Sequence, residues 1–225
     1  MQGDQLAHIV EELTAEPEEA YTLQQVVDQA VTNIPGCDMG SVFVRRNGRV
    51  ELAANSDGTA TQIDELQFEF DEGPCLEALD DREIVHVADT EHEDRWPRWA
   101  RETRDLGVRS SLSVRLMTEP SFFACLNMYS REVHGFDSDS VDRAVVYARL
   151  ASVAISQARE VSGLRSALHN RLVIGAAQGI LMERYGLSLD RAFEVLRRHS
   201  NETNTKLRDV AQSVLDDAGV RNPVR

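Results

Sequence analysis

The chain has 225 residues, of which 42% are hydrophobic and 28% charged, and it carries a formal net charge of −14 at pH 7. A chain of this length can hold one large domain or two modest ones. No apolar run reaches the roughly 18 residues that a membrane span requires, and the acidic, amphipathic start lacks the basic and apolar regions of a secretory signal. We therefore expect a cytoplasmic protein that does not cross a membrane.

The net negative charge of the chain comes from residues 1–160. Residues 1–160 contain 14 arginines and 31 acidic residues, a net charge of −17. Residues 161–225 contain 9 arginines and one lysine against 7 acidic residues, a net charge of +3. This asymmetry is typical of an acidic body that carries a basic binding module, although drift of surface charge would produce the same numbers. We expect two domains, residues 1–160 and 161–225.

Taken in order, the chain begins with two amphipathic helices. Apolar residues recur at helical spacing on both sides of Pro17, and the second helix ends at Pro35 and Gly36. Two runs of alternating β-branched residues then flank Arg46-Asn47-Gly48, which predicts a β-hairpin with an Asn-Gly turn.

The middle of the chain alternates between strands and helices. A run toward Phe70 is followed by a turn at residues 71–74, a short helix over residues 76–79 and a strand over residues 84–87. A helix over residues 100–107 then ends at Gly107. Two strands follow, over residues 110–116 and 122–130, with a turn at Glu119-Pro120 between them. This order predicts an antiparallel sheet with helices on its faces, an α+β fold.

A metal site is not expected in this region. His86 lies in a strand pattern, and His92 with Glu91 and Glu93 lacks the helical spacing of histidine ligands.

A long helix without proline is predicted over residues 140–185, with Ser138 or Ser140 as its N-cap and Gly163 as a weak point. It would connect the two domains. Its alanines suit close contact with another helix, so we expect a parallel homodimer. The alternative is that the same stripe packs on the chain's own sheet. These alanines are Ala148, Ala151, Ala154 and Ala158.

The last part of the sequence predicts a three-helix bundle. Its first helix is the end of the long helix and stops at Gly186. The second begins after the N-cap Ser188 and ends near His199. A polar loop over residues 200–205 precedes the third helix, residues 206–217. On the second helix we assign Ala192, Phe193, Val195 and Leu196 to the apolar side.

Several motifs, in order, resemble the GAF domains of bacterial signalling proteins over about residues 5–158. They are DEGPCLEAL at 71–79, VAD at 87–89, RWP at 95–97, GVRSS at 107–111 and LNMYS at 126–130. The resemblance implies a central antiparallel sheet flanked by helices. It also implies a pocket on one sheet face, which holds a small molecule in many members and nothing in others. The signature of cyclic-nucleotide GAF domains is absent, so the ligand or cofactor is unknown.

The cysteines Cys37, Cys75 and Cys125 are odd in number and lack CxxC spacing, which fits a reducing compartment without a disulfide framework. Cys75 follows a Gly-Pro turn and begins a short helix, a position that can activate a thiol. Some GAF relatives use cysteines to reduce methionine sulfoxide, so a redox enzyme using Cys75 and Cys125 is one alternative. The other interpretation of Cys75 is a small apolar residue that fills the sheet face.

Motifs at the C-terminal end are similar to the ANTAR family, the RNA-binding domain of transcription antitermination regulators, over about residues 165–217. They are AQGILM at 177–182, YG at 185–186, AF at 192–193, LR at 196–197, NTKL at 204–207 and DVA at 209–211. The resemblance implies binding to a pair of short hairpins in nascent mRNA, which prevents an intrinsic terminator from forming. A receiver domain usually controls such proteins. Here a GAF-like region takes its place, so control by ligand, redox state or a partner is implied.

Arginine and lysine contact RNA phosphates, whereas aromatic side chains stack on loop bases. For any one arginine a solvated helix face is the simpler explanation, and only the set as a whole points to RNA. Gln178 stands where relatives often carry lysine, Gly179 is expected to allow close helix packing, and His199 is a further stacking group. The candidate RNA-binding residues are Arg171, Gln178, Arg184, Tyr185, Arg191, Arg197, Arg198, Lys206 and Arg208.

These observations predict an antitermination regulator without catalytic residues. The main alternative is a DNA-binding regulator of the helix-turn-helix type. The connection of about five polar residues between the last two helices is longer than the tight turn of that motif, which counts against it.

Overall fold

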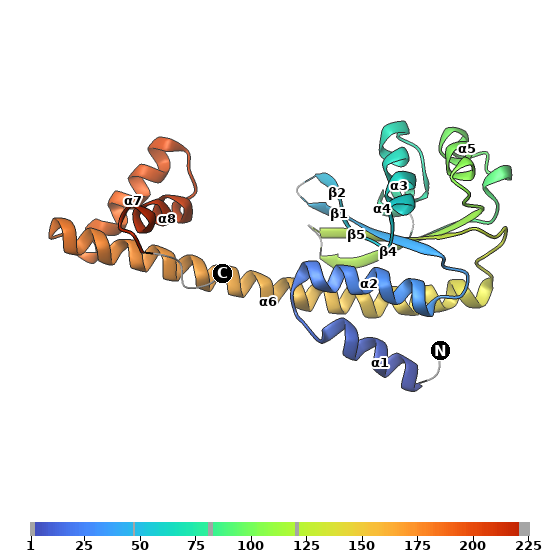
Figure 1. The fold of residues 1–225 in the computed structure, drawn as a ribbon, viewed down its shortest axis with the longest axis horizontal. Coiled ribbons are helices and arrows are strands. Elements are labelled where there is room, and N and C mark those ends of the chain that lie inside the picture. The colour runs from blue at the N-terminus through green and yellow to red at the C-terminus, as the bar shows by residue number, and fades with distance from the viewer. Residues whose placement is uncertain (1–2, 47, 81–82, 120–121, 221–225) are drawn as a thin grey trace. The chain divides into compact units, whose positions relative to one another are not determined.

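The computed structural model describes residues 3–46, 48–80, 83–119 and 122–220 (Figure 1). The chain divides into two compact units, which we call the sheet unit (Met1–Val161) and the helical unit (Ser162–Arg225). Helix α6 (Ser138–Tyr185) belongs to both and continues without interruption through Gly163. None of the helices in the described ranges is long and apolar enough to cross a membrane.

The sheet unit is built on an antiparallel sheet of five strands in the order β2-β1-β5-β4-β3, which confirms the predicted α+β fold. The predicted hairpin is formed by β1 and β2, and its residue Asn47 lies outside the described residues. Pro120, predicted to turn between β4 and β5, also lies outside them. The strands are β1 (Met39–Arg46), β2 (Arg49–Asn55), β3 (Ile84–Val87), β4 (Ser110–Glu119) and β5 (Phe122–Ser130).

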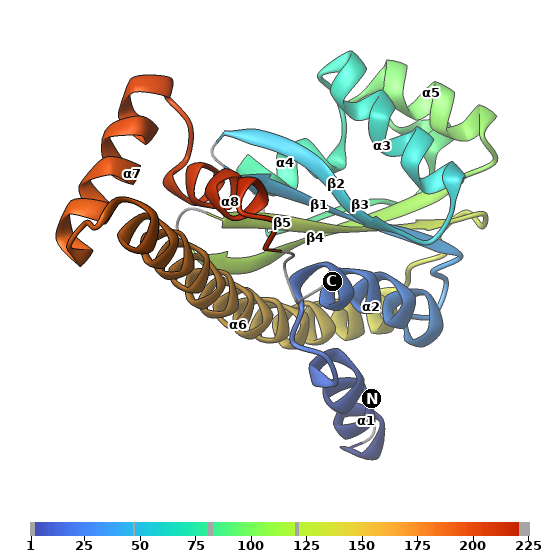
Figure 2. The same ribbon diagram turned by 60° about the vertical axis from the view of Figure 1, so that its left-hand side comes forward.

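One face of the sheet is covered by α2 (Glu19–Asn33) and the first part of α6, with α1 (Gly3–Thr14) packed beside them (Figures 1 and 2). The strand residues that point to this face are apolar, such as Val42, Val114 and Leu126. The alanine stripe of α6 is buried here, because small side chains let a helix lie close to a sheet. The four alanines therefore pack within their own unit and are not available to a partner helix.

The opposite face carries α3 (Gly58–Phe70), α4 (Pro74–Asp80) and α5 (Pro97–Asp105), with a short 3-10 helix, η1 (Thr90–His92), beside them (Figure 2). Sequence reasoning left the residues of α3 without an assignment. Asp57 caps this helix by accepting hydrogen bonds from the N–H groups of Thr59 and Ala60 at 2.8 and 3.0 Å. Its buried side includes Asp64 and Gln67, so its apolar stripe is too weak to reveal a helix.

The start of α6 differs from prediction. Asp137, and not Ser138 or Ser140, caps the helix: its Oδ1 accepts a hydrogen bond from the N–H of Ser140 at 2.8 Å. An aspartate one position earlier supplies a stronger acceptor for the unpaired N–H groups of the first turn.

The helical unit consists of the end of α6, α7 (Leu189–Thr203) and α8 (Leu207–Asp217). Ser188 caps α7 as predicted, since its hydroxyl accepts from the N–H of Arg191. However, α7 continues four residues past His199 to Thr203, and its C-cap Asn204 has a left-handed backbone with φ of 51°. The bundle core comprises Val173, Ala177, Leu181, Ala192, Leu196, Val210, Ala211 and Leu215.

Two residues predicted to face this core do not enter it. Phe193 and Val195 are exposed, whereas Ala192 and Leu196 are buried. The buried face of α7 is therefore narrower than its apolar residues suggest, and it leaves apolar side chains on the surface.

We expect Leu196→Ala to destabilise the helical unit by about 2–5 kcal/mol, because it leaves a cavity in a small core. Its neighbour Val195→Ala is the matched control and should change stability by no more than about 0.5 kcal/mol, because Val195 is 47% exposed while Leu196 is 1% exposed. Urea unfolding followed by circular dichroism measures both variants. Equal effects of the two substitutions would contradict the described core.

Candidate functional site

Eight of the nine candidate RNA-binding residues are exposed on the helical unit. The exception is Gln178, which is half-buried. Its Nε2 donates a hydrogen bond to the carbonyl oxygen of Leu189 at 3.2 Å, which ties α6 to the first residue of α7. RNA that contacted the amide nitrogen of Gln178 would therefore have to replace this hydrogen bond within the bundle.

Three of the exposed arginines have acidic neighbours on their own helices. Arg191 lies 3.3 Å from Glu194, Arg198 lies 3.3 Å from Glu202, and Arg208 lies 2.9 Å from Asp209. Exposed pairs of this kind contribute only about 0.3–0.5 kcal/mol. Such arginines can exchange a carboxylate for a phosphate at little cost. Within residues 162–220, Arg171, Arg184, Arg197 and Lys206 have no ion pair.

The connection between α7 and α8 places positive charge at a helix N-terminus. Lys206 occupies the N-cap position of α8 without a capping bond from its side chain, and Arg208 lies in the first turn. Cations are unfavourable at this end of a helix, where the unpaired N–H groups and the helix dipole attract anions. The same arrangement suits a phosphate. A hydrogen bond of 2.6 Å from the Ser200 hydroxyl to the Thr205 carbonyl oxygen stiffens the connection.

This connection is also shorter than predicted. Because α7 continues through residues 200–203, only Asn204, Thr205 and Lys206 link it to α8. The expected five-residue polar loop is wrong, and its length no longer argues against a helix-turn-helix arrangement.

The end of α6 offers a group that could stack on a base. Tyr185 is 68% exposed, and Gly186, with φ of 63°, turns the chain directly after it. His199 is exposed on α7. Gly179 was predicted to allow close helix packing, but no described atom outside its own helix backbone lies within 4 Å of a Cβ built there, so no other helix of this chain packs closely against it.

A second polar site lies inside the sheet unit, between α3 and the sheet. The buried carboxyl oxygen Oδ1 of Asp64 accepts hydrogen bonds from the hydroxyl of Tyr129 at 2.6 Å and from Nδ2 of Asn127 at 2.9 Å. It also accepts one from Nε2 of Gln67 at 3.2 Å. Sequence reasoning missed this cluster. Its signal was the polar residues at alternate positions of β4 and β5, namely Ser111, Ser113, Asn127 and Tyr129.

Asp64 is a buried acid poised to titrate near neutral pH. Burial raises its pKa to about 7, although hydrogen bonds from Ser41, Tyr129, Asn127 and Gln67 act in the opposite direction. The second oxygen, Oδ2, is buried and has no hydrogen-bond partner among the described residues. Protonation of this carboxyl therefore removes a buried negative charge.

The turn before α4 is fitted to this cluster. Gln67 Oε1 accepts a hydrogen bond from the N–H of Cys75 at 2.8 Å. Gly73 adopts φ of 141°, and a Cβ there would overlap the Gln67 side chain. Only glycine fits at this position.

The histidines considered as metal ligands have other contacts. His86 lies on β3, and His92 Nδ1 lies 2.7 Å from Asp89 Oδ2, which lowers the pKa of Asp89 to about 2. Arg109 bridges Asp89 and Glu91 at 3.1 and 3.0 Å. In the described part of the chain, no group of three His, Cys, Asp or Glu side chains is placed to hold a metal ion.

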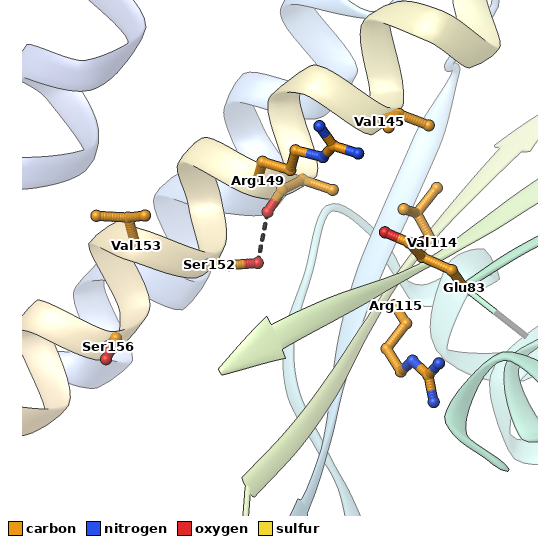
Figure 3. A pocket seen from close by; sticks show the side chains of 9 residues that line it. Glu83, Val114, Arg115, Val145, Arg149, Ser152, Val153 and Ser156 are labelled. Carbon is orange, nitrogen blue, oxygen red and sulfur yellow. Dashed lines mark hydrogen bonds between the residues drawn. The ribbon is translucent and has the colours of Figure 1, made fainter. Parts of the chain in front are cut away.

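A hollow of about 480 Å³ lies on the other face of the sheet, beside α6 (Figure 3). Val145 and Val153 of α6 and Val114 of β4 are among its lining residues. Arg115 points away from α6 (Figure 3). The Ser152 hydroxyl already donates to the Ala148 carbonyl oxygen at 2.6 Å. We assign no ligand to this hollow.

Comparison with known proteins assigns both units. Residues 17–156 match the GAF domain model, and residues 162–215 match the ANTAR domain model. The chain belongs to the GAF domain family. A GAF domain followed by an ANTAR domain is the order predicted from the sequence, and it supports a regulator of the ANTAR antitermination family. A search of curated proteins found no match.

Three similar solved structures have identities below 25% to this chain and therefore support the GAF fold alone. The GAF domain of a phosphoenolpyruvate-protein phosphotransferase from Coxiella burnetii has 21% identity and a TM-score of 0.57, covering 71% of this chain and 95% of that one. The corresponding Acinetobacter domain has 19% identity and a TM-score of 0.54, covering 72% and 98%. The free methionine-R-sulfoxide reductase from Neisseria meningitidis has 14% identity and a TM-score of 0.53, covering 69% and 89%.

We expect Asp64 to make stability fall as pH rises from about 4 to about 7. The folded-state pKa of about 7 exceeds the ordinary aspartate pKa of 3.8, so in this window the unfolded chain has lost a proton that the folded chain retains. Asp64→Asn keeps the acceptor and removes the titration, which should abolish up to about 4 kcal/mol of this dependence.

The exposed Asp71→Asn is the matched control, because Asn tolerates the left-handed backbone at this position. Urea unfolding at a series of pH values measures both variants. If the wild type and Asp64→Asn shared one pH profile, Asp64 would not be the titrating group.

Proposed function

We propose that this protein is a cytoplasmic transcription antitermination regulator. Its ANTAR domain binds paired hairpins in nascent mRNA and prevents terminator formation, under the control of the GAF domain. The observation that carries the proposal is the ANTAR match over residues 162–215, which falls on the basic part of the chain. The protein acts by binding, without catalysis.

The geometry of the ANTAR domain supports contact with RNA. Lys206 and Arg208 at the N-terminus of α8 receive phosphates, and the weakly paired arginines of α7 add to this positive surface. Tyr185 stacks on an unpaired loop base. In this scheme Gln178 positions α7 through its bond to Leu189.

A second candidate function is DNA binding. The three-residue connection between α7 and α8 favours it, because helix-turn-helix proteins join their two helices by a tight turn. Binding of a double-hairpin RNA and of a DNA duplex of equal length, each over a salt series, separates the two functions. A preference for the duplex would reject the proposal for RNA.

Exposed leucines on α6 support a homodimer. Leu164, Leu168 and Leu172 are 61–64% exposed and lie four residues apart, so they share one face of the helix. Their neighbours on the buried face, such as Val173 and Ala177, already fill the bundle core. A second copy of the chain would bury the leucines in a symmetric pair of α6 helices and would bring two ANTAR domains to paired hairpins.

Replacing both Lys206 and Arg208 by Ala should weaken RNA binding at least about tenfold. The negative slope of log affinity against log salt concentration should become shallower by about one to two, because fewer phosphates are neutralised. Lys206 makes no capping bond, so its loss should leave α8 intact. The matched control replaces Arg101 and Arg104 of α5 in the GAF domain. Filter binding at several salt concentrations measures both variants, and an unchanged slope would place the RNA site elsewhere.

Leu168→Lys should convert a dimer to a monomer, because it places a charge in the middle of the proposed apolar contact. Ser166→Lys is the matched control, since it is exposed and points to the opposite side of α6. Sedimentation equilibrium measures both variants. If Leu168→Lys had the same oligomeric state as the wild type, the leucine face would not form the contact.

A further inference from the structure

Two cysteines that are 50 positions apart in the sequence meet inside the GAF domain. Cys75 lies in the first turn of α4, and Cys125 lies in the middle of β5, on the sheet face that α4 covers. Both are fully buried in a cluster with Phe43, Ala78 and Val85. Both are free thiols.

The two cysteines pack in the same buried cluster, and the Cys75 thiol is close enough to affect the pKa of Cys125. Burial raises the pKa of Cys125 well above its ordinary value, and the nearby Cys75 thiol adds to this effect. The third cysteine, Cys37, lies apart from them in the core on the other sheet face. Its Sγ makes a hydrogen bond of 3.5 Å to the Met39 carbonyl oxygen.

The surroundings of the pair tolerate a bond between the sulfurs. The Cys125 thiol donates to Asn127 Oδ1 at 3.3 Å, and this hydrogen bond would be lost. The Ser113 hydroxyl donates to the same oxygen at 2.8 Å, so Asn127 Oδ1 would keep a partner. The other members of the hydrophobic cluster, among them Phe43, Ala78 and Val85, have no polar side-chain group that a disulfide could leave unsatisfied. Asp64 and Arg115 are the charged groups that act on Cys125.

We propose that Cys75 and Cys125 form a reversible disulfide that links α4 to β5 when the protein meets a hydroperoxide. One thiol attacks the peroxide and becomes a sulfenic acid, with release of the first water molecule when the oxidant is hydrogen peroxide. The second thiol then attacks this sulfur and releases the second water molecule. Two thiols and one peroxide thus give one disulfide and two waters, and a dithiol reductant reverses the reaction.

The position of the two cysteines makes disulfide formation intramolecular, and their burial shields both thiols from the oxidant. Because the sulfurs already lie together, the second step needs no encounter between molecules. Because both are buried, the first step needs α4 to move from the sheet, and α4 is a single short helix of 7 residues. The disulfide would then hold α4 in place. This inference concerns the GAF domain alone and does not depend on what the ANTAR domain binds.

The test uses the full-length protein, reduced, exposed to hydrogen peroxide and then alkylated under denaturing conditions. Trypsin places the cysteines in separate peptides, Cys75 in residues 50–82, Cys125 in residues 116–131 and Cys37 in residues 1–45. We expect a disulfide-linked pair of the first two peptides, lighter by two hydrogens than their sum. The Cys37 peptide should remain alkylated, and a dithiol should restore all three free thiols.

The variants give a second, independent readout. Cys75→Ser and Cys125→Ser should each abolish the linked pair, whereas the matched control Cys37→Ser should retain it. The melting temperature of the wild type and of Cys37→Ser should rise by several degrees on oxidation and return on reduction, because the bond closes a long loop. Glutathione added to the same sample shows whether the peroxide treatment oxidises thiols. If glutathione were oxidised while Cys75 and Cys125 could still be alkylated, the proposal would be overturned. A disulfide that involves Cys37 or a second chain would also overturn it.

Discussion

Helix α6 has to bury part of its surface in two separate cores. In the GAF domain it does so with small residues, among them Ala144, Ala148 and Ala151, which let it lie close to the sheet beside α2. The hydroxyl of Tyr147 donates to the Val26 carbonyl oxygen at 2.7 Å and fixes the two helices to each other. In the ANTAR domain the same helix buries Val173, Ala177 and Leu181, each four residues from the next. The intervening stretch, residues 159–172, has no buried residue.

The two faces of the sheet differ in chemistry, and this difference separates scaffold from site. The face under α2 and α6 is apolar, which is the arrangement that hydrophobic burial stabilises most. The other face buries Ser41, Ser113, Asn127 and Tyr129 together with Asp64. Buried polar groups are tolerable only when their hydrogen bonds are satisfied, and Asp64 Oδ2 remains unpaired. The buried carboxyl of Asp64 and the cysteines Cys75 and Cys125 thus lie on the face that does not carry α6.

The sequence predicted those elements whose pattern is local and strong. The hairpin, β4 and β5, the length of α6 and the Ser188 cap follow from alternation, helical periodicity and capping chemistry. Helix α3 was missed because its buried side includes a carboxylate and an amide. The end of α7 was misplaced because polar residues 200–203 suit a loop as well as an exposed helix turn.

Contacts between distant segments could not be read from local patterns. The residues next to Gln178 in the sequence do not indicate that its amide reaches Leu189. Those next to Asp64 likewise do not indicate that its carboxyl contacts Asn127. The meeting of Cys75 with Cys125 likewise depends on which sheet face α4 covers. The positions of the exposed basic residues, by contrast, were predictable, because solvated charges need no partner.

The charge division limits the RNA binding proposed for the ANTAR domain. The C-terminal part of the chain has a net charge of only +3, so phosphate neutralisation would give one copy a modest affinity that salt weakens further. Stacking on unpaired bases is less sensitive to salt than phosphate contacts are, and it would have to supply the remaining affinity. Two ANTAR domains joined through α6 would double the positive charge and make the second hairpin contact intramolecular. The proposed dimer and the proposed recognition of paired hairpins thus depend on each other, since a weakly charged module gains from binding twice.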